Sequence, residues 1–379
     1  MTMIYKNFKN YKLSALGMGA MRLPVIGGQD AAIDEEAVTE MVAQAMKQGI
    51  NYYDTAWGYH DGQSEIVMGK ALGRYPRESY FLADKFPGYD LSNMDKVETI
   101  FEEQLLKCGV EYFDFYLFHN VCEMNIEAYL DEKHGIMQYL LAQKERKRIR
   151  HLGFSVHGSY EVMKQFLEAY GNRMEFCQIQ LNYIDWTFQD AQAKVKLAGE
   201  YKIPIWVMEP LRGGRLATLP ADLAARLEAL RPWEKISAWA FRFLQSLPEV
   251  TMTLSGMSSF EQLQENIETF QDEKPLDDKE FETLLNIAEN MVSQIALPCT
   301  TCRYCLSHCP QQLDIPNLLA LYNEHCFSRG GFLAPMALMA VPEEKRPGAC
   351  AGCGSCEEVC PQQIRISEAM SDFSARLES

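Results

Sequence analysis

Four ionisable residues stand at or just after the ends of three predicted strands: Asp54, Tyr59, Lys85 and His119. A free phenol has a pKa of about 10 and is a poor acid or base at neutral pH. A nearby ammonium group favours the phenolate, so Lys85 could make Tyr59 a usable acid–base. Asp54 would keep Lys85 charged, and His119 would hydrogen-bond a substrate oxygen. The four residues together predict reduction of a carbonyl group, which needs a proton donor beside a hydride donor.

A cysteine motif, C-x₂-C-x₂-C-x₃-C-P, occurs twice near the C-terminus. Its ligand candidates are Cys299, Cys302, Cys305, Cys309, Cys350, Cys353, Cys356 and Cys360. Three close thiolates can hold one iron–sulfur cube while the fourth turns towards a second cube. This predicts two [4Fe–4S] clusters with crossed ligands: Cys299, Cys302, Cys305 and Cys360 on one, and Cys350, Cys353, Cys356 and Cys309 on the other. Zinc is the alternative, but a zinc site needs only four ligands and usually uses two C-x₂-C pairs.

The charge, the N-terminal sequence and the other cysteines indicate the location of the protein and the classes of partner it could bind. The formal net charge of −16 argues against nucleic acid or an anionic membrane as a partner. We see no signal peptide, and the apolar run at 331–341 is shorter than the roughly 20 residues that span a bilayer. The other cysteines are scattered, as is typical of reduced thiols. We expect a soluble, cytoplasmic protein with a small-molecule carbonyl substrate, and its partners could include a redox protein.

Residues 1–270 alternate strand-like and helix-like segments, and these must position the four ionisable groups. The predicted strands are 13–20, 50–55, 80–85, 113–118, 149–155, 176–181, 204–208 and 250–254. Eight strands, each followed by helix, predict a (β/α)₈ TIM barrel, in which catalytic groups lie where strands end. A doubly wound sheet is the competitor. Its G-x-G-x-x-G fingerprint fails, because Gly17 and Gly19 are followed by Arg22.

The chain changes character after the predicted barrel. Residues 271–280, QDEKPLDDKE, are acidic and irregular, and a predicted helix then leads to Pro298. We therefore predict a barrel over 1–275, a linker helix over 276–298, and a small, mainly helical iron–sulfur domain over 299–379. About forty residues separate the two cysteine motifs, so a helical insert is expected between them.

Several motifs give residues 1–270 a resemblance to the aldo/keto reductase family. They are DTAWGY with SEIVMGKAL, LADKF, YLFHN, GFS at Gly153, QIQLN at Gln178, EPLRGGRL at Glu209 and SGMSSFEQLQEN at Ser255. The full chain resembles the branch of that family with a C-terminal ferredoxin-like domain that holds two [4Fe–4S] clusters. The resemblance implies NADPH or NADH as the hydride donor, Tyr59 as the proton donor, and Asp54, Lys85 and His119 as the rest of a catalytic tetrad.

The resemblance also implies a set of cofactor-binding residues. Ser155 and Gln178 would hold the nicotinamide carboxamide, and the segments 211–216 and 256–266 would cradle the phosphates and adenosine. Within those segments the expected contacts are Leu211, Arg212, Gly213, Arg215, Gly256, Ser258, Gln262 and Asn266.

Three positions depart from the family pattern. Val156 replaces the usual asparagine, and Met208 replaces the aromatic residue that stacks on the nicotinamide. Residues 258, 259 and 262 lack the basic side chains that usually clamp a 2′-phosphate. Either NADH is used, or Arg212 or Arg215 reaches over, or the nicotinamide site has decayed.

Three functions remain open from the sequence. The barrel could be a carbonyl reductase with structural, sensory or electron-transferring clusters. The clusters could instead feed electrons to a substrate at the tetrad without nicotinamide. The chain could also be an electron-transfer or docking protein with an inactive barrel.

Overall fold

The chain folds into two compact units, Met1–Leu284 and Leu285–Ser379, in a computed structural model. The structure describes residues 3–293, 296–299 and 302–378. A helix, α12 (Asp278–Ser293), spans the boundary between the units. The division into 1–275, 276–298 and 299–379 stays a prediction.

The first unit contains a closed barrel of eight parallel strands, which confirms the predicted fold and excludes the doubly wound sheet. The strands adjoin in the order β10-β3-β4-β5-β6-β7-β8-β9. Their bounds are β3 (Leu16–Gly19), β4 (Tyr52–Asp54), β5 (Phe81–Phe86), β6 (Phe113–Val121), β7 (Ile149–Val156), β8 (Cys177–Gln180), β9 (Ile205–Met208) and β10 (Val250–Gly256).

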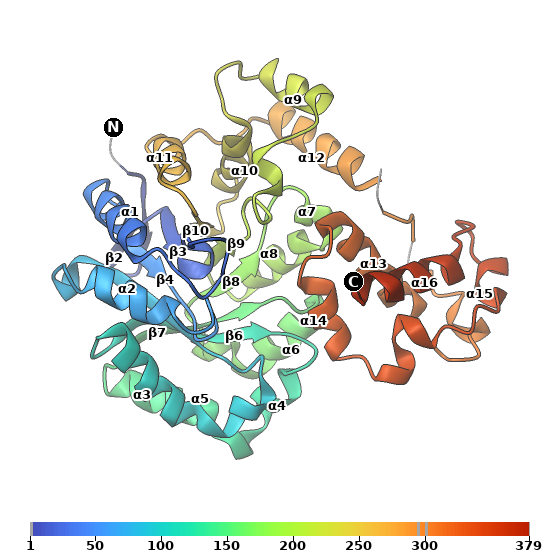
Figure 1. Ribbon diagram of the computed structural model, residues 1–379, viewed down its shortest axis with the longest axis horizontal. Coiled ribbons are helices and arrows are strands. Elements are labelled where there is room, and N and C mark those ends of the chain that lie inside the picture. The colour runs from blue at the N-terminus through green and yellow to red at the C-terminus, as the bar shows by residue number, and fades with distance from the viewer. Residues whose placement is uncertain (1–2, 294–295, 300–301, 379) are drawn as a thin grey trace. The chain divides into compact units, whose positions relative to one another are not determined.

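Helices surround the barrel, and at least one follows each strand (Figure 1). Their bounds are α1 (Glu35–Lys47), α2 (Ser64–Leu72), α3 (Val97–Cys108), α4 (Ile126–Leu130), α5 (Ile136–Glu145), α6 (Tyr160–Tyr170), α7 (Asp185–Phe188), α8 (Ala191–Glu200), α9 (Ala221–Glu228), α10 (Ile236–Gln245) and α11 (Phe260–Thr269).

Local chemistry explains where several of these helices begin and end. The Asp34 side chain accepts a hydrogen bond from Ala37 N at 3.0 Å, as predicted for an N-cap. Ser259 caps α11 in the same way, through Gln262 N. Gly109, with φ of 63°, ends α3 in the left-handed conformation that glycine adopts at little cost.

An N-terminal hairpin, β1 (Tyr5–Phe8) and β2 (Tyr11–Ser14), was not predicted. The predicted first strand, 13–20, joins the end of β2 to β3, and the barrel strand begins only at Leu16. The hairpin turns at Lys9, whose φ is 51°, so the glycine that usually signals such a turn is missing. Phe8 packs in one buried cluster with Phe115 and Trp206 from the barrel strands, so the hairpin contributes to the barrel core.

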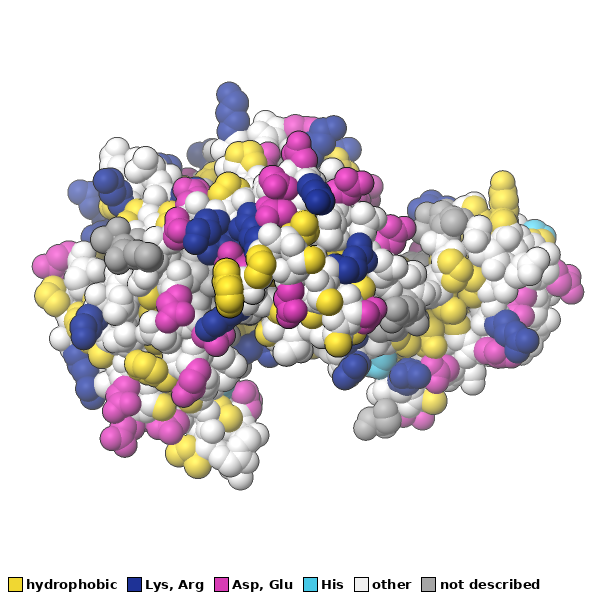
Figure 2. Space-filling model, turned by 90° about the horizontal axis from the view of Figure 1, so that it is seen from above, with side chains coloured by type: hydrophobic (Ala, Val, Ile, Leu, Met, Phe, Trp, Pro, Cys, Tyr) yellow, Lys and Arg dark blue, Asp and Glu magenta, His cyan; other side chains and the backbone are white. Residues whose placement is uncertain are grey.

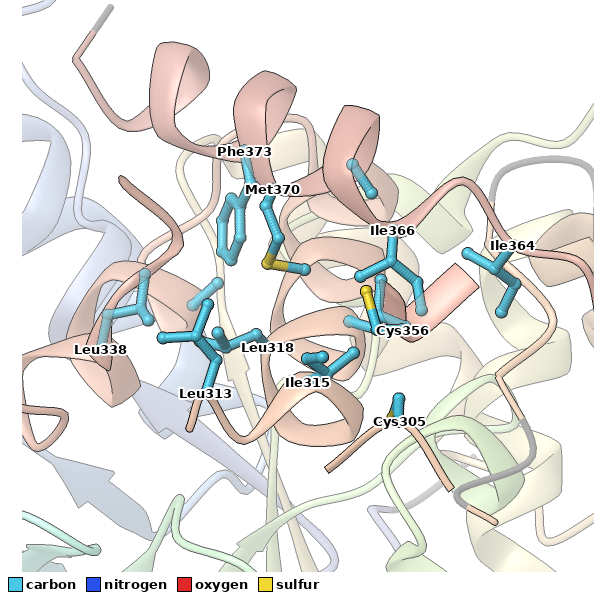
Figure 3. Close-up of a cluster of buried hydrophobic side chains, with 13 residues drawn as sticks. Cys305, Leu313, Ile315, Leu318, Leu338, Cys356, Ile364, Ile366, Met370 and Phe373 are labelled. Atoms are coloured by element: carbon cyan, nitrogen blue, oxygen red, sulfur yellow. The ribbon is translucent and has the colours of Figure 1, made fainter. Parts of the chain in front are cut away.

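The second unit is helical, as predicted for the iron–sulfur domain. Its helices are α13 (Ile315–Ser328), α14 (Leu333–Met339), α15 (Ser355–Glu358) and α16 (Ile366–Leu377). They bury an apolar cluster that includes Leu318, Met370 and Phe373 together with the thiols of Cys305 and Cys356 (Figure 3).

Charged side chains of both signs are interspersed over the face shown in Figure 2. Within the described part of the chain, no helix has the length and apolar character needed to cross a bilayer.

Candidate active site and cluster cavities

Three neighbouring strands bring the four predicted catalytic residues together at the carboxyl end of the barrel. Asp54 ends β4, Lys85 lies near the end of β5, and His119 lies near the end of β6. The Lys85 Nζ atom donates to Asp54 Oδ1 at 2.6 Å, to the Thr55 carbonyl at 2.7 Å and to the Tyr59 hydroxyl at 3.3 Å. A single buried ammonium group therefore joins the acid and the phenol.

Aromatic rings surround the phenol of Tyr59. Its ring lies edge-on to the His119 imidazole with centroids 6.0 Å apart, and Tyr89 approaches His119 in the same way at 5.2 Å. Within the described chain the His119 Nδ1 atom is buried and has no hydrogen-bond partner. The imidazole is thus held mainly by packing. Tyr89, which the sequence analysis did not single out, lines the site.

Burial and charge set the protonation of these groups. Burial raises the pKa of Tyr59 and Lys85 lowers it, with the result above the ordinary value of 10.0. Burial lowers the pKa of Lys85, but Asp54 and Tyr59 outweigh it and the pKa is raised. Burial and then Lys85 lower the pKa of His119 well below 6.5. The site therefore holds a protonated phenol, an ammonium group and a neutral imidazole at neutral pH.

A buried polar network fixes Lys85 from the outer face of the barrel. The Gln104 amide donates to the Lys85 carbonyl at 3.0 Å and to Asp84 Oδ1 at 2.9 Å, and Asp84 Oδ1 also accepts from Lys85 N at 2.8 Å. Burial, and then the nearby Glu65 carboxylate, raise the pKa of Asp84 well above its ordinary value. This network was not predicted, because outward-facing polar residues on a strand usually indicate exposure.

Ser155 and Gln178, the predicted carboxamide contacts, lie opposite each other on β7 and β8. Gln178 is buried, and its Oε1 atom has no hydrogen-bond partner among the described residues. Ser155 Oγ accepts from Asn120 N at 2.8 Å, which leaves its own hydrogen able to donate. A buried unpaired acceptor is costly. An amide N–H donor would satisfy it, so the position fits a nicotinamide carboxamide.

In the first predicted phosphate segment, the arginine expected to bind a nucleotide is already paired with a carboxylate of the protein. Arg212 is buried, and its Nε atom contacts both carboxylate oxygens of Asp185 at 3.0 and 3.2 Å, so this arginine is already engaged. The segment turns through Gly213 and Gly214, both at positive φ, and leaves Leu211 and Arg215 half-buried.

In the second segment, the polar side chains of Gln262 and Asn266 are already hydrogen-bonded within the protein. Gln262 Oε1 accepts from Ser258 N at 2.8 Å, and the Asn266 amide donates to Ser255 Oγ at 3.0 Å. Gly256, at the end of β10, is exposed.

Arg22, just after β3, is a cation beside both predicted phosphate segments that the sequence analysis did not single out. A Cβ atom added at Gly213 would lie 3.3 Å from Arg22 Nη2, and one added at Gly256 would lie 3.1 Å from Arg22 Cβ. Arg22 therefore touches both phosphate segments. Its Nη2 atom donates to Glu209 Oε1 at 3.0 Å. The sequence could have indicated Arg22 only as a basic residue three positions after the glycine that ends the predicted first strand's barrel segment, Gly19.

The eight motif cysteines line two separate cavities in the second unit. The first cavity is lined by Cys299, Cys302, Cys305 and Cys360. The second cavity is lined by Cys309, Cys350, Cys353 and Cys356. These are the two crossed sets that the motif spacing predicts.

Each of the two cavities brings four thiols together. Four thiols around a shared cavity are the donor set of a cubane cluster.

Sequence comparison supports both units. The family model of the aldo/keto reductases matches residues 15–289, and that of a 4Fe-4S dicluster domain matches residues 298–365.

Relatives and solved structures agree for the barrel. The chain is 25% identical to L-galactose dehydrogenase of Arabidopsis thaliana over 68% of this chain and 84% of that protein. It is 24% identical to the NADH-specific methylglyoxal reductase of Escherichia coli over 67% and 89%. The fold resembles an aldo-keto reductase from Bacillus halodurans, with a TM-score of 0.61, 22% identity and coverage of 75% of this chain and 96% of that one. An aldo-keto reductase from Klebsiella pneumoniae in complex with NADPH gives a TM-score of 0.61, 18% identity and coverage of 76% and 96%. The chain therefore belongs to the aldo/keto reductase family and is an oxidoreductase of the branch that carries a C-terminal 4Fe-4S dicluster domain.

Proposed function

We propose that the barrel reduces a small aldehyde or ketone with NADH or NADPH, and that Tyr59 is the proton donor. The observation that carries this proposal is the buried Lys85 ammonium group, which contacts both Asp54 and the Tyr59 hydroxyl. Two relatives with matching barrels are named as a dehydrogenase and a methylglyoxal reductase, in keeping with carbonyl chemistry.

Each member of the tetrad has one task in this reaction. A bound nicotinamide supplies the hydride, which adds two electrons to the carbonyl carbon. The neutral His119 orients the substrate oxygen by a hydrogen bond, and Tyr59 donates its proton to that oxygen as charge develops. Lys85 stabilises the phenolate left behind, and Asp54 keeps Lys85 charged and directed. Tyr59 then regains its proton from solvent.

The charges of the cofactor segments favour NADH over NADPH. The positions that would clamp a 2′-phosphate are Ser258, Ser259 and Gln262, and none is basic. Arg212 is held by Asp185 and Arg22 is held by Glu209, so neither replaces the missing cation. A 2′-phosphate would lose charge-assisted hydrogen bonds here.

We further propose that the two crossed cysteine sets hold two [4Fe–4S] clusters. Their thiolates would bind iron, and each cluster when bound carries one electron at a time. The surrounding apolar side chains keep water from the buried thiols of Cys305 and Cys356.

A second candidate function is reduction of a substrate at the tetrad by electrons from the clusters, without nicotinamide. Met208 at the end of β9 and Val156 at the end of β7 favour it, because both positions lose a contact that normally holds the nicotinamide ring. In that case the same Tyr59 would donate the proton, but the electrons would arrive singly.

The variant Tyr59→Phe tests the proposed role of this residue, with Tyr89→Phe as a matched control. Tyr89 also packs on His119, yet no hydrogen bond joins it to Lys85 among the described residues. We expect Tyr59→Phe to lower kcat for carbonyl reduction by about 10²–10⁴-fold while nicotinamide binding and cluster absorbance persist. Tyr89→Phe should stay within about tenfold of the wild type. Equal losses in both variants would remove Tyr59 from the role of proton donor.

A further inference from the structure

The two cysteine motifs are close repeats, but their charged residues differ. The first reads CRYCLSHCPQQLD from Cys302, and the second reads CGSCEEVCPQQIR from Cys353. Arg303 in the first copy corresponds to Gly354 in the second, and Glu357 and Glu358 in the second correspond to Leu306 and Ser307 in the first. The repeats thus place opposite charges beside chemically identical ligand sets.

Arg303 lines the first cavity and is its only charged wall residue within the described part of the chain. It adopts a left-handed φ of 64° between Cys302 and the next ligand, Cys305. No carboxylate of the described residues forms an ion pair with it. The side chain is exposed, so its positive charge acts on whatever occupies that cavity under partial screening by solvent.

The second cavity has the opposite surroundings. None of the described residues that line it is charged, but Ser367 lines it and binds the Glu357 carboxylate. Ser367 N donates to Glu357 Oε1 at 2.7 Å, and Ser367 Oγ donates to the same oxygen. Glu357 directly follows the ligand Cys356. A fixed negative charge is thus held beside this cavity.

Four other features bear on this asymmetry. Lys345 Nζ donates at 2.7 Å to the carbonyl of Gln311, which lines the second cavity, so a cation also lies beside that cavity and offsets part of the Glu357 charge. Arg365, which follows the first set, is paired with Glu368 at 2.9 Å, and both side chains are exposed.

Leu313 N donates to Cys309 Sγ at 3.4 Å, which favours reduction at the second cavity. Ser355 also hydrogen-bonds the Cys353 thiol of the second set through its backbone and its side chain. These contacts come from dipoles, whereas Arg303 and Glu357 carry full charges.

The two cavities share a wall. Ile366 lines both of them, and the buried thiols Cys305 and Cys356 belong to one apolar cluster (Figure 3). One ligand of each set is exposed, namely Cys302 and Cys353, so exposure does not distinguish the sites. Charge is then the main difference between two neighbouring clusters.

We propose that the clusters have unequal reduction potentials, and that Arg303 and Glu357 set the difference. Reduction adds one negative charge to a cluster. Arg303 stabilises the reduced form in the first cavity, and Glu357 disfavours it in the second. An electron from an external one-electron donor therefore settles in the first cavity, whose Cys302 edge is open to solvent. This inference rests on the proposed presence of both clusters.

An anaerobic redox titration of the full-length, cluster-loaded protein tests the proposal. Absorbance and electron paramagnetic resonance should show two one-electron steps at separate potentials in the wild type. Arg303→Gln should move only the higher step, to lower potential. Glu357→Gln keeps an oxygen acceptor for Ser367 and should move only the lower step, to higher potential. Arg329→Gln and Glu344→Gln, which line neither cavity, should move neither step.

The results distinguish a failure of the proposed inequality from a failure of the proposed clusters. The proposal is overturned if the two reduction steps of the wild type occur at the same potential. It is also overturned if Arg303→Gln moves the lower step or Glu357→Gln moves the higher step. If Arg303→Gln fails to retain iron, the wild-type separation and Glu357→Gln still decide the matter. Iron and sulfide analysis of the wild type is a separate check: a protein that never holds about eight irons would contradict the proposed clusters themselves, rather than their inequality.

Discussion

At the scale of single residues, the central feature is one buried ammonium group with three acceptors. Lys85 contacts the Asp54 carboxylate, a backbone carbonyl and the Tyr59 hydroxyl. The residue types at three strand ends were enough to predict that these side chains lie close together, because parallel strands of a barrel end on one face. The supporting groups could not be predicted, because the contacts of Gln104 and Asp84 depend on which side of β5 each residue faces.

The pH dependence of carbonyl reduction follows from the tetrad. His119 has a pKa well below 6.5, so it stays neutral and gives no loss of rate between about pH 6 and pH 8. Tyr59 must be protonated to act as donor. Its pKa is raised above 10.0, so the rate is full below that pKa and is lost only as the pH rises through it. An acidic limb near pH 6.5 in the kcat profile that disappears in His119→Asn would contradict this assignment.

If a nucleotide binds along the two predicted phosphate segments, the Glu209 carboxylate would compete with it for Arg22. The two side chains pair at 3.0 Å beside both phosphate segments. Glu209→Gln removes the competing charge, so the Kd for NADH should fall by about fivefold, the equivalent of about 1 kcal/mol. Fluorescence titration measures this, with Glu249→Gln in the loop before β10 as the control. Weaker binding by Glu209→Gln would show that the carboxylate holds Arg22 in its working position.

At the scale of elements, the sequence predicted the strands better than the contacts between helices. Eight apolar segments bounded by turn residues mark the barrel strands, and Asp34 and Ser259 mark helix starts. The hairpin was missed because its turn at Lys9 lacks glycine. The carboxylate partners of Arg22 and Arg212 were missed because they come from segments far apart in the chain.

Gly69 shows how closely two helices pack, and it can be tested by substitution. A Cβ atom there would lie 2.6 Å from the Cys108 carbonyl oxygen, which is backbone and cannot turn away. Gly69→Ala in α2 should lower the free energy of unfolding by about 1–3 kcal/mol. Gly199→Ala in α8 is the matched control, since nothing lies within 4 Å of its added Cβ. It should stabilise by about 0.5–1 kcal/mol. Urea unfolding measures both, and equal effects would contradict close packing at Gly69.

At the scale of the whole molecule, two units with different sources of stability share one chain. The first has a large apolar barrel core, whereas the core of the second includes Cys305 and Cys356, two of the proposed cluster ligands. Metal binding to such thiols contributes directly to folding free energy. The sequence predicted the barrel from its alternating strand-like and helix-like segments, and the iron–sulfur domain from the cysteine motifs after Pro298.

Removal of iron should therefore affect the two units differently. We expect anaerobic calorimetry to show two unfolding transitions in the loaded protein. Chelation of iron should abolish or strongly lower one transition and leave the barrel transition within a few degrees. Circular dichroism would show a matching loss of helix. Two unchanged transitions after complete iron loss would mean that the second unit folds without its clusters.

The most direct test of the central claim follows the reducing hydrogen. The protein is mixed anaerobically with NADH carrying deuterium on the transferred face of C4 and with a small aldehyde such as methylglyoxal, and the alcohol is analysed by mass spectrometry. Direct reduction in the barrel predicts one deuterium on the former carbonyl carbon for each turnover, in the wild type and at a much lower rate in Tyr59→Phe. Alcohol that forms without deuterium would contradict direct transfer, and would mean that the electrons reach the substrate through the clusters.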